Sequence, residues 1–278
     1  MSSETDRPVN PNKALWEKGD FTRIAEAMRD GGEALVATLG VTPELDVLDL
    51  GCGDGTTAVP EAQLGANVLG VDIAENLVAA GNERAQRFGL PNLRFQWGDA
   101  TDLDDLADDS FELVVSIFGA MFAPKPFEVA KEVVRVTRPG GRIVMGNWIP
   151  NDPTFAAQLL RISTAYSPPP PEGFVSPMTW GVEENVLERF GAAGIPAEDI
   201  TCERTMFLFE SPNTPSQYLA DFRDYYGPTM NAYTAAAANG REAELHGELG
   251  ALVNEHNSAE EGEGTRIEAA YLRVTVMV

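Results

Sequence analysis

The chain has 278 residues, 44% of them hydrophobic, and a formal net charge of −23 at pH 7. That length is sufficient for one large domain with a cap, and the acidic balance argues against a nucleic-acid partner, which would require a basic surface. No apolar stretch approaches the roughly 18 residues needed to cross a bilayer, so we expect no membrane span.

Apolar runs and helical patterns alternate through the first half of the chain. An early helix is predicted over Thr22–Leu39. Strands and helices then follow in the order Glu44–Leu50, Thr56–Leu64, Asn67–Asp72, Glu75–Phe88, Leu93–Trp97, Phe111–Ile117, Pro126–Thr137 and Arg142–Trp148. This alternation indicates βαβ units, and therefore a right-handed, doubly wound, parallel sheet.

After Trp148 the pattern changes. Residues 150–181 are rich in proline and aromatic side chains, and we predict a stiff loop beside a pocket. The later elements are predicted as a helix, a strand, a helical stretch and a final strand: Glu183–Ala193, Ile200–Phe209, Pro212–Asn257 and Ile267–Val278. The run Glu260–Gly264 has the composition of a solvated connector.

The segment Val47–Gly55 is the most informative in the chain. Its apolar run ends in glycines on alternate positions, Gly51, Gly53 and Gly55, and a helical pattern follows at once. Glycines let a ligand approach the backbone closely, and the N-terminus of the following helix presents unpaired N–H groups. Such a turn at the carboxyl end of a parallel strand is typical of a nucleotide-type site.

Residues around this turn distinguish between two ligands. A dinucleotide fingerprint has a third glycine where this chain has Thr56, and the Asp49 carboxylate would be poorly placed beside a pyrophosphate. Asp49 would suit a cationic amine. Asp72, which ends the next apolar run, can accept two hydrogen bonds from ribose hydroxyls. These groups together fit S-adenosylmethionine better than NAD, and an NAD-dependent oxidoreductase is the weaker alternative.

Five motifs then occur in the order and spacing of one large enzyme family: Val47–Gly55, Val71–Ala74, Gly98–Ala100, Phe111–Ser116 and Arg138–Arg142. On these motifs, residues 15–148 resemble a class I S-adenosylmethionine-dependent methyltransferase. The resemblance implies an α/β, doubly wound, Rossmann-like fold. Its mostly parallel seven-stranded sheet would carry helices on both faces.

The same resemblance implies how the rest of the chain is organised. The sheet would end in an antiparallel pair, Thr201–Phe209 and Ile267–Val276. Residues 1–278 would form a single domain, with the 150–181 loop and a helical cap over 212–258 inserted above the active site.

The resemblance also implies a set of cofactor-binding residues. The glycine turn and Asp49 would hold the methionine moiety, Asp72 the ribose and Asp99 the adenine amino group. For both Asp49 and Asp99, a capping carboxylate is the alternative. The full set is Phe21, Asp49, Gly51, Cys52, Gly53, Asp72, Ile73, Asp99, Ala100, Ser116 and Ile117.

Four of these residues have less specific roles. Ile73 would lie against the adenine, and Ser116 and Ile117 would end the strand where sulfonium and acceptor meet. An aromatic from the N-terminal segment, Phe21 or Trp16, would close over the cofactor. For either aromatic, packing in the core is an equal alternative.

Few groups are suited to acid–base chemistry. Histidine is the usual general base, but His246 and His256 lie among glutamates and fit a solvated helix face better. No catalytic residue is therefore identified, and in-line positioning of the acceptor is expected to supply much of the rate. Cys202 fits a small buried hydrophobe, and no Cys/His/Asp spacing indicates a metal site.

Aromatic side chains are concentrated after residue 147. Because pockets are mostly apolar, some of them should line the acceptor site, and we expect a small, partly apolar acceptor. The cap is expected to act as a lid, with Tyr218, Phe222 and Tyr225 facing inward. The aromatics are Trp148, Tyr166, Phe174, Trp180, Tyr218, Phe222, Tyr225, Tyr226 and Tyr233.

The compartment is expected to be the cytoplasm. The two cysteines, Cys52 and Cys202, lie far apart in the sequence and no disulfide is expected, which fits a reducing environment. Residues Met1–Asn12 are polar and do not form a signal peptide. The oligomeric state is left open.

The lack of a visible base motivates a second hypothesis, a non-catalytic module that binds S-adenosylmethionine or scaffolds a partner. It predicts that Met121, Phe122 or Trp148 fills the space beside Ser116 and Ile117. A methyltransferase instead requires a substrate-sized cavity there.

Overall fold

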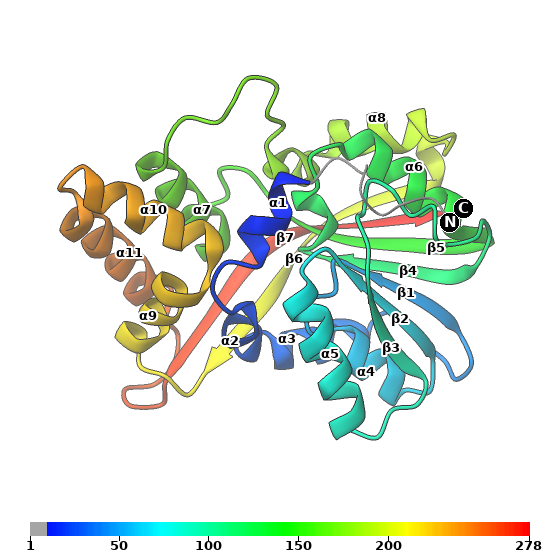
Figure 1. The fold of residues 1–278 in the computed structure, drawn as a ribbon, viewed down its shortest axis with the longest axis horizontal. Helices are drawn as coiled ribbons and strands as arrows, with labels where there is room; N and C mark the ends of the chain where they lie inside the picture. The colour runs from blue at the N-terminus through cyan, green and yellow to red at the C-terminus, as the bar shows by residue number, and fades with distance from the viewer. Residues whose placement is uncertain (1–9) are drawn as a thin grey trace.

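Seven strands form one sheet in the structure, a computed structural model that describes residues 10–278 (Figure 1). Their order is β3-β2-β1-β4-β5-β7-β6, and β7 runs antiparallel to both of its neighbours, whereas β1 to β5 are parallel. The strands are β1 (Asp46–Leu50), β2 (Asn67–Asp72), β3 (Leu93–Trp97), β4 (Phe111–Ile117), β5 (Thr137–Trp148), β6 (Ile200–Ser211) and β7 (Thr265–Met277). The predicted mostly parallel sheet with a closing antiparallel pair is confirmed.

Helices cover both faces of this sheet (Figure 1). Helices α3, α4 and α5 lie on one face, and α6 and α8 lie on the other. The helices are α1 (Pro11–Trp16), α2 (Phe21–Glu26), α3 (Arg29–Val36), α4 (Ala58–Gln63), α5 (Glu75–Arg87), α6 (Pro126–Val136), α7 (Phe155–Tyr166), α8 (Glu183–Ala192), α9 (Pro215–Tyr225), α10 (Gly227–Ala238) and α11 (Glu242–His256). Short 3₁₀ helices are η1 (Ala120–Phe122), η2 (Pro177–Gly181) and η3 (Ala197–Asp199).

The central strands are buried because each is a nearly continuous apolar run, as expected for a parallel sheet covered on both faces. Val47 and Leu48 of β1 and Val114 of β4 have no exposed surface. The carboxyl ends of these strands lie at one edge, where Leu50 of β1 pairs with Val71 of β2. The loops that follow β1, β2 and β4 therefore meet at this edge.

Four helices, which we call the cap, lie beyond the carboxyl ends of the parallel strands (Figure 1). Helix α7 comes from the β5–β6 connection, and α9, α10 and α11 connect β6 to β7. Helix α7 packs against α10, α11 and β7. The two ends of the α9–α11 insertion are adjacent, because Ser211 of β6 pairs with Thr265 of β7.

The loop predicted over 150–181 is wrong for residues 155–166, which form α7. Prolines flank this segment but do not occur inside it. Its buried residues Phe155, Leu159, Ile162 and Tyr166 recur at helical spacing, a signal that the neighbouring prolines obscured.

The helix predicted over 22–39 is two helices, α2 and α3. At the break, the carbonyl of Ala27 accepts a hydrogen bond from the Glu210 amide of β6 at 2.8 Å, which connects this point of the chain to the sheet. Helix α3 then packs closely on β6 at Gly31, where a Cβ atom would lie 2.9 Å from the Phe207 ring.

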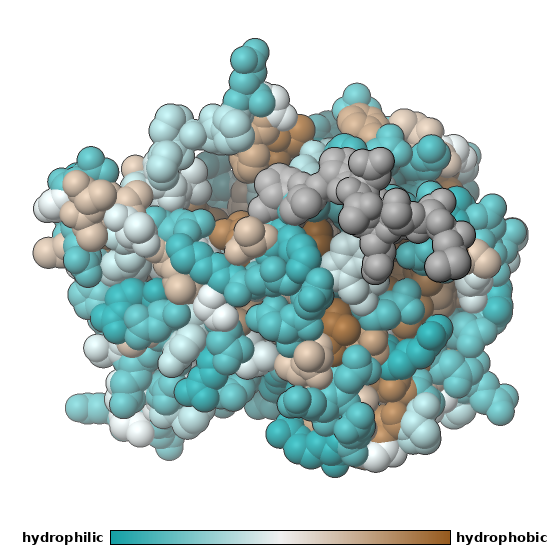
Figure 2. Space-filling view, in the orientation of Figure 1, coloured by the Kyte–Doolittle hydropathy of each residue, from teal (hydrophilic) through white to brown (hydrophobic). Residues whose placement is uncertain are grey.

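Within residues 10–278, no helix is both long enough and apolar enough to cross a membrane. The face shown in Figure 2 is mostly hydrophilic, consistent with the charge of −23. The expectation that Met1–Asn12 do not form a signal peptide rests mostly on residues 1–9. These residues lie outside the described part of the chain.

Candidate functional site

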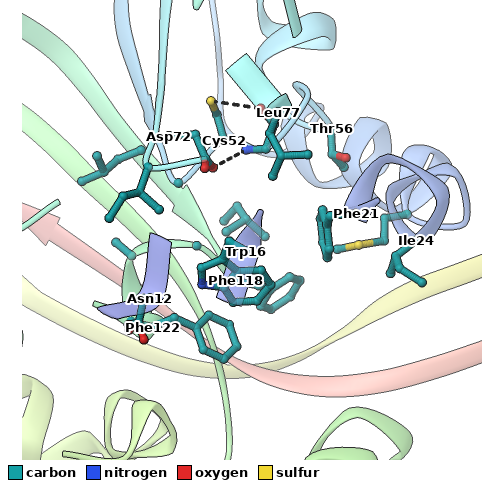
Figure 3. Close-up of a pocket in the computed structure, with 18 of the residues that line it drawn as sticks. Asn12, Trp16, Phe21, Ile24, Cys52, Thr56, Asp72, Leu77, Phe118 and Phe122 are labelled. Carbon is teal, nitrogen blue, oxygen red and sulfur yellow. Dashed lines mark hydrogen bonds between the residues drawn. The ribbon is translucent and has the colours of Figure 1, made fainter. Parts of the chain in front are cut away.

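A deep cavity opens at the carboxyl ends of β1, β2 and β4, between the sheet, the N-terminal helices and the cap (Figure 3). Nine of the eleven predicted cofactor-binding residues line it, all except Asp49 and Ser116. The nine are Phe21, Gly51, Cys52, Gly53, Asp72, Ile73, Asp99, Ala100 and Ile117. The sheet topology thus brings together motifs that are far apart in the sequence.

The glycine turn after β1 forms one wall of this cavity. Gly51 and Gly53 have φ angles of +68° and +56°, in the left-handed region that glycine adopts without strain. The loop after β4 crosses against the turn, and a Cβ atom on Gly51 would lie 2.6 Å from the Cα atom of Gly119. A Cβ atom on Gly53 would meet only the Phe21 ring, at 3.8 Å, so the turn is open to a ligand on this side.

Asp72 ends β2 beside the turn (Figure 3). Its carboxylate accepts hydrogen bonds from the amides of Gly53, at 2.8 Å, and Ala74, at 2.9 Å. Burial raises the pKa of Asp72 above its usual value of 3.8, while these bonds oppose the shift. Each oxygen keeps a further lone pair, so the group fits a pair of ribose hydroxyls.

Asp99 follows β3 and is half-buried. One carboxylate oxygen accepts from the amide and hydroxyl of Thr101, each at 2.9 Å, and the other accepts from the side-chain amide of Asn10 at 2.9 Å. The NH₂ group of Asn10 donates to Asp99 in the same way that the exocyclic amino group of adenine could. Asp99 therefore fits an adenine edge, with Ile73 and Ala100 as apolar walls.

The cavity continues from these motifs into an apolar end. Phe118, just after β4, has a φ of +58°, which is strained for a residue other than glycine, and its ring stacks on Trp148 with centroids 3.6 Å apart. Among the described residues that line this end, none carries a charge at neutral pH. They are Ile24, Met28, Phe118, Trp148, Phe155, Ala156, Leu159, Leu160, Phe207, Phe209, Phe222 and Tyr226.

Comparisons with known proteins agree with this geometry. A family model described as a methyltransferase domain matches residues 48–145. The uncharacterized protein Rv1403c of Mycobacterium tuberculosis is 32% identical over 237 residues, which cover 85% of this chain and 84% of that protein. The chain belongs to the class I S-adenosylmethionine-dependent methyltransferases. S-adenosylmethionine is accordingly its cofactor, and the glycine turn, Asp72 and Asp99 fit its parts.

Two further comparisons cover different shares of this methyltransferase. A demethylmenaquinone methyltransferase of Renibacterium salmoninarum is 35% identical over 121 residues, which cover 44% of this chain and 48% of that protein. The crystal structure of the YcgJ protein from Bacillus subtilis matches with a TM-score of 0.57 at 19% identity, over 88% of this chain and 97% of that chain. This second likeness shows the fold.

Asp49 and Ser116 of the methyltransferase lie behind the cavity wall rather than on it. Asp49 is 1% exposed and accepts a hydrogen bond from the Thr57 hydroxyl at 2.6 Å. The Ser116 hydroxyl donates to the carbonyl of Leu50 at 2.6 Å and accepts from the amide of Ala120 at 2.9 Å. Both side chains brace the wall, and direct contact of either with the cofactor stays a prediction.

The buried carboxyl groups behind the turn should make stability depend on pH. Burial raises the pKa of Asp49 from 3.8 to about 7, and it also raises the pKa of Glu61 and Asp72. A carboxyl group whose pKa is higher in the folded chain binds more protons there than in the unfolded chain, between roughly pH 4 and pH 7 for Asp49. Stability should therefore fall as pH rises through this range.

The Asp49→Asn variant tests this linkage, because asparagine still accepts from Thr57 but does not ionise. In scanning fluorimetry, we expect the unfolding temperature of the wild type to fall as pH rises from about 4 to about 7, and that of Asp49→Asn to fall less. The exposed Asp104→Asn should behave like the wild type. If the unfolding temperatures of the wild type and Asp49→Asn changed equally with pH, the raised pKa of Asp49 would be contradicted.

The aromatics after residue 147 divide into two groups. Trp148, Phe222 and Tyr226 line the cavity. Tyr218 and Tyr225 were expected to face it, but this is wrong. Tyr218 is buried in the cap against Phe155 and Phe222, and the guanidinium of Arg23 lies 5.6 Å from the ring of Tyr225.

The histidines also lie away from the cavity. Nδ1 of His246 lies 2.8 Å from the Tyr233 hydroxyl, on the exposed side of α11, and His256 packs beside the Phe155 ring. Cys202 lies half-buried on β6, where burial raises its pKa to about 11, so it is not a reactive thiolate at neutral pH. Both cysteines are free.

On the N-terminal side of the cavity, sequence reasoning predicted an aromatic residue but missed Asn10 and Asn12. Asn10 caps α1 and reaches Asp99, while the side-chain amide of Asn12 donates to the carbonyl of Phe122. Trp16 and Phe21 both line the cavity, with ring centroids 5.8 Å apart. The available signal was the Asn10-Pro11 pair, which is typical of a helix start.

Proposed function

We propose that this methyltransferase transfers the methyl group of S-adenosylmethionine to a small, neutral, partly apolar acceptor that is held under the cap. The observation that carries the proposal is the continuity of the cavity, which runs from the cofactor motifs to an end lined by apolar side chains of the sheet and the cap. Cofactor and acceptor can meet there away from bulk water. In-line positioning can then supply much of the rate.

The cofactor supplies an electrophilic methyl group on a sulfonium centre. We assign the backbone of Gly51–Gly53 to the methionine moiety and Asp72 to the ribose. Asp99 is assigned to the adenine amino group, where it would exchange its bond with Asn10 for one with the base. Phe21 is assigned to cover the bound cofactor, since its ring is the nearest group to the open side of Gly53.

The charge of the acceptor follows from the apolar end of the cavity. An unpaired charge among apolar side chains is strongly unfavourable, and no described side chain that lines this end can compensate one. The enclosed part of the acceptor is therefore neutral. These residues also include no general base, so the proton that a hydroxyl or ring carbon loses on methylation passes to water rather than to a side chain of this end.

The non-catalytic alternative is supported less. It predicts that Met121, Phe122 or Trp148 fills the space beside Ser116 and Ile117, whereas Ile117, Phe122 and Trp148 all line the cavity. Met121 is buried in the core. The relative named as a demethylmenaquinone methyltransferase aligns with 44% of the chain, so it supports methyl transfer and does not select a quinone as the acceptor.

Two measurements test the proposal. Calorimetry with S-adenosylhomocysteine tests whether the protein binds the cofactor. Incubation with tritium-labelled S-adenosylmethionine and a panel of naphthols, indoles, fatty acids and alkylamines tests which class of compound accepts the methyl group. We expect label in the neutral aromatic compounds. Absence of S-adenosylhomocysteine binding would reject the cofactor assignment, and label confined to the acids or amines would reject the acceptor class.

The Ala156→Phe variant tests where the acceptor sits. Ala156 of α7 lines the apolar end, so a phenylalanine there should occupy the acceptor space. We expect methyl transfer to fall at least about tenfold, with S-adenosylhomocysteine affinity unchanged within about twofold. Ala237→Phe, on an exposed position of α10, is the matched control. Loss of cofactor affinity in Ala156→Phe would show that the cofactor, rather than the acceptor, occupies this end of the cavity.

A further inference from the structure

Tyr226 occupies the junction between the two halves of the cavity. It connects α9 to α10 in an extended conformation, and its backbone pairs with Gly19 of the N-terminal segment. Its ring lies 6.1 Å from that of Phe21, at the cofactor half, and 5.5 Å from that of Phe222, in the cap. Contacts on both sides therefore fix the position of this ring.

The Tyr226 hydroxyl differs from those of Tyr166, Tyr218 and Tyr233, and the remaining cap tyrosine, Tyr225, does not line the cavity. Tyr166 donates to Glu248 at 2.6 Å, and the Tyr233 hydroxyl lies 2.8 Å from His246. The Tyr218 hydroxyl has no partner, but protein atoms enclose it completely. Tyr226 lines the cavity, and its hydroxyl is not hydrogen-bonded to any described residue.

This hydroxyl is the polar group that the cap contributes to the apolar end. The other described cap residues that line the cavity are Phe155, Ala156, Leu159, Leu160 and Phe222, which have no side-chain hydrogen-bonding group. Burial raises the pKa of Tyr226 further above neutrality, so the phenol stays protonated and offers one donor and two lone pairs. A buried site of this kind selects a ligand that completes its hydrogen bond.

We propose that Tyr226 hydrogen-bonds to a neutral oxygen, a hydroxyl or carbonyl, on the methyl acceptor, and so selects oxygen-bearing aromatic acceptors and fixes their orientation under the cap. This inference rests on the proposed function. It assigns Tyr226 to the acceptor rather than to the cofactor, because its ring packs 5.5 Å from Phe222 of the cap, whereas Phe21 is the side chain nearest to the open side of Gly53.

The Tyr226→Phe variant removes only the hydroxyl and tests the proposal by binding, without turnover. 2-Naphthol and naphthalene serve as matched probes, titrated into protein saturated with S-adenosylhomocysteine and followed by tryptophan fluorescence. The wild type is expected to prefer 2-naphthol by about tenfold, and Tyr226→Phe to bind both probes equally. Tyr218→Phe removes an unpartnered hydroxyl away from the cavity, so it should keep the wild-type preference.

Three outcomes would overturn the assignment: a wild type without preference, a Tyr226→Phe variant that keeps the preference, or a loss of S-adenosylhomocysteine affinity in that variant. The third outcome would place the hydroxyl on the cofactor instead. Failure of the proposed function is separate, because it appears as absent S-adenosylhomocysteine binding or absent label transfer in the wild type. The unfolding temperature of each variant, measured in parallel, confirms that the compared proteins are folded.

Discussion

Asp72→Ala is expected to weaken binding of S-adenosylhomocysteine by about 100-fold or more. Two charge-assisted hydrogen bonds to ribose hydroxyls would be lost, each contributing about 1.5–3 kcal/mol before water compensates. The substitution also removes the acceptor for the amides of Gly53 and Ala74, which hold the glycine turn in place. Both effects act in the same direction, and calorimetry measures their sum.

Two variants separate these contributions. Asp72→Asn keeps an oxygen that can accept from one of the two amides but loses the charge, so its affinity should fall between those of the wild type and Asp72→Ala. Asp104→Ala removes an exposed carboxylate outside the cavity and should bind as the wild type does. An unchanged dissociation constant in Asp72→Ala would remove Asp72 from the site.

The second large effect is expected for Gly119→Ala, and its origin is steric. Gly119 has a φ of −102°, which alanine adopts readily, so backbone preference is not the obstacle. The added Cβ atom would lie 2.7 Å from the Cα atom of Gly51. Since the atoms in its way are backbone rather than a flexible side chain, the glycine turn must shift. Overpacking of this kind destabilises by about 1–3 kcal/mol.

We expect Gly119→Ala to unfold several degrees below the wild type and to bind S-adenosylhomocysteine at least about tenfold more weakly. Scanning fluorimetry and calorimetry provide the two readouts. Gly191→Ala on α8 is the matched control, because its Cβ atom would meet nothing within 4 Å and alanine favours a helix. Wild-type affinity in Gly119→Ala would show that the close approach of the two loops is dispensable for the site.

The parallel sheet could be predicted from the sequence because its signals are local. Strands β2, β3 and β4 have the predicted bounds, since β2 and β4 are short apolar runs and β3 alternates apolar with polar residues. Strand β5 begins five residues earlier than predicted, at Thr137 instead of Arg142. This start depends on pairing with Phe111 across an irregular register, and a distant partner leaves no local signal.

The acceptor end could not be predicted because it depends on how the cap helices cross. Tyr225 and Tyr226 are adjacent in the sequence and equally aromatic, yet only the second lines the cavity. Phe118 and Trp148 stack at the ends of β4 and β5, and Phe118 needs a left-handed backbone to do so. Composition indicates that aromatic residues are available but does not indicate which of them face the cavity.

The pairing of Ser211 with Thr265 has a consequence for how such enzymes diversify. The chain leaves the sheet at one residue and returns beside it, so the segment between them can change in length with little effect on the strands. The glycine turn, Asp72 and Asp99 all precede residue 150. Evolution can therefore replace α9, α10 and α11, and with them the cavity-lining Phe222 and Tyr226, while the cofactor motifs and α7 are retained. The same boundary marks where a protein engineer could exchange these helices between relatives.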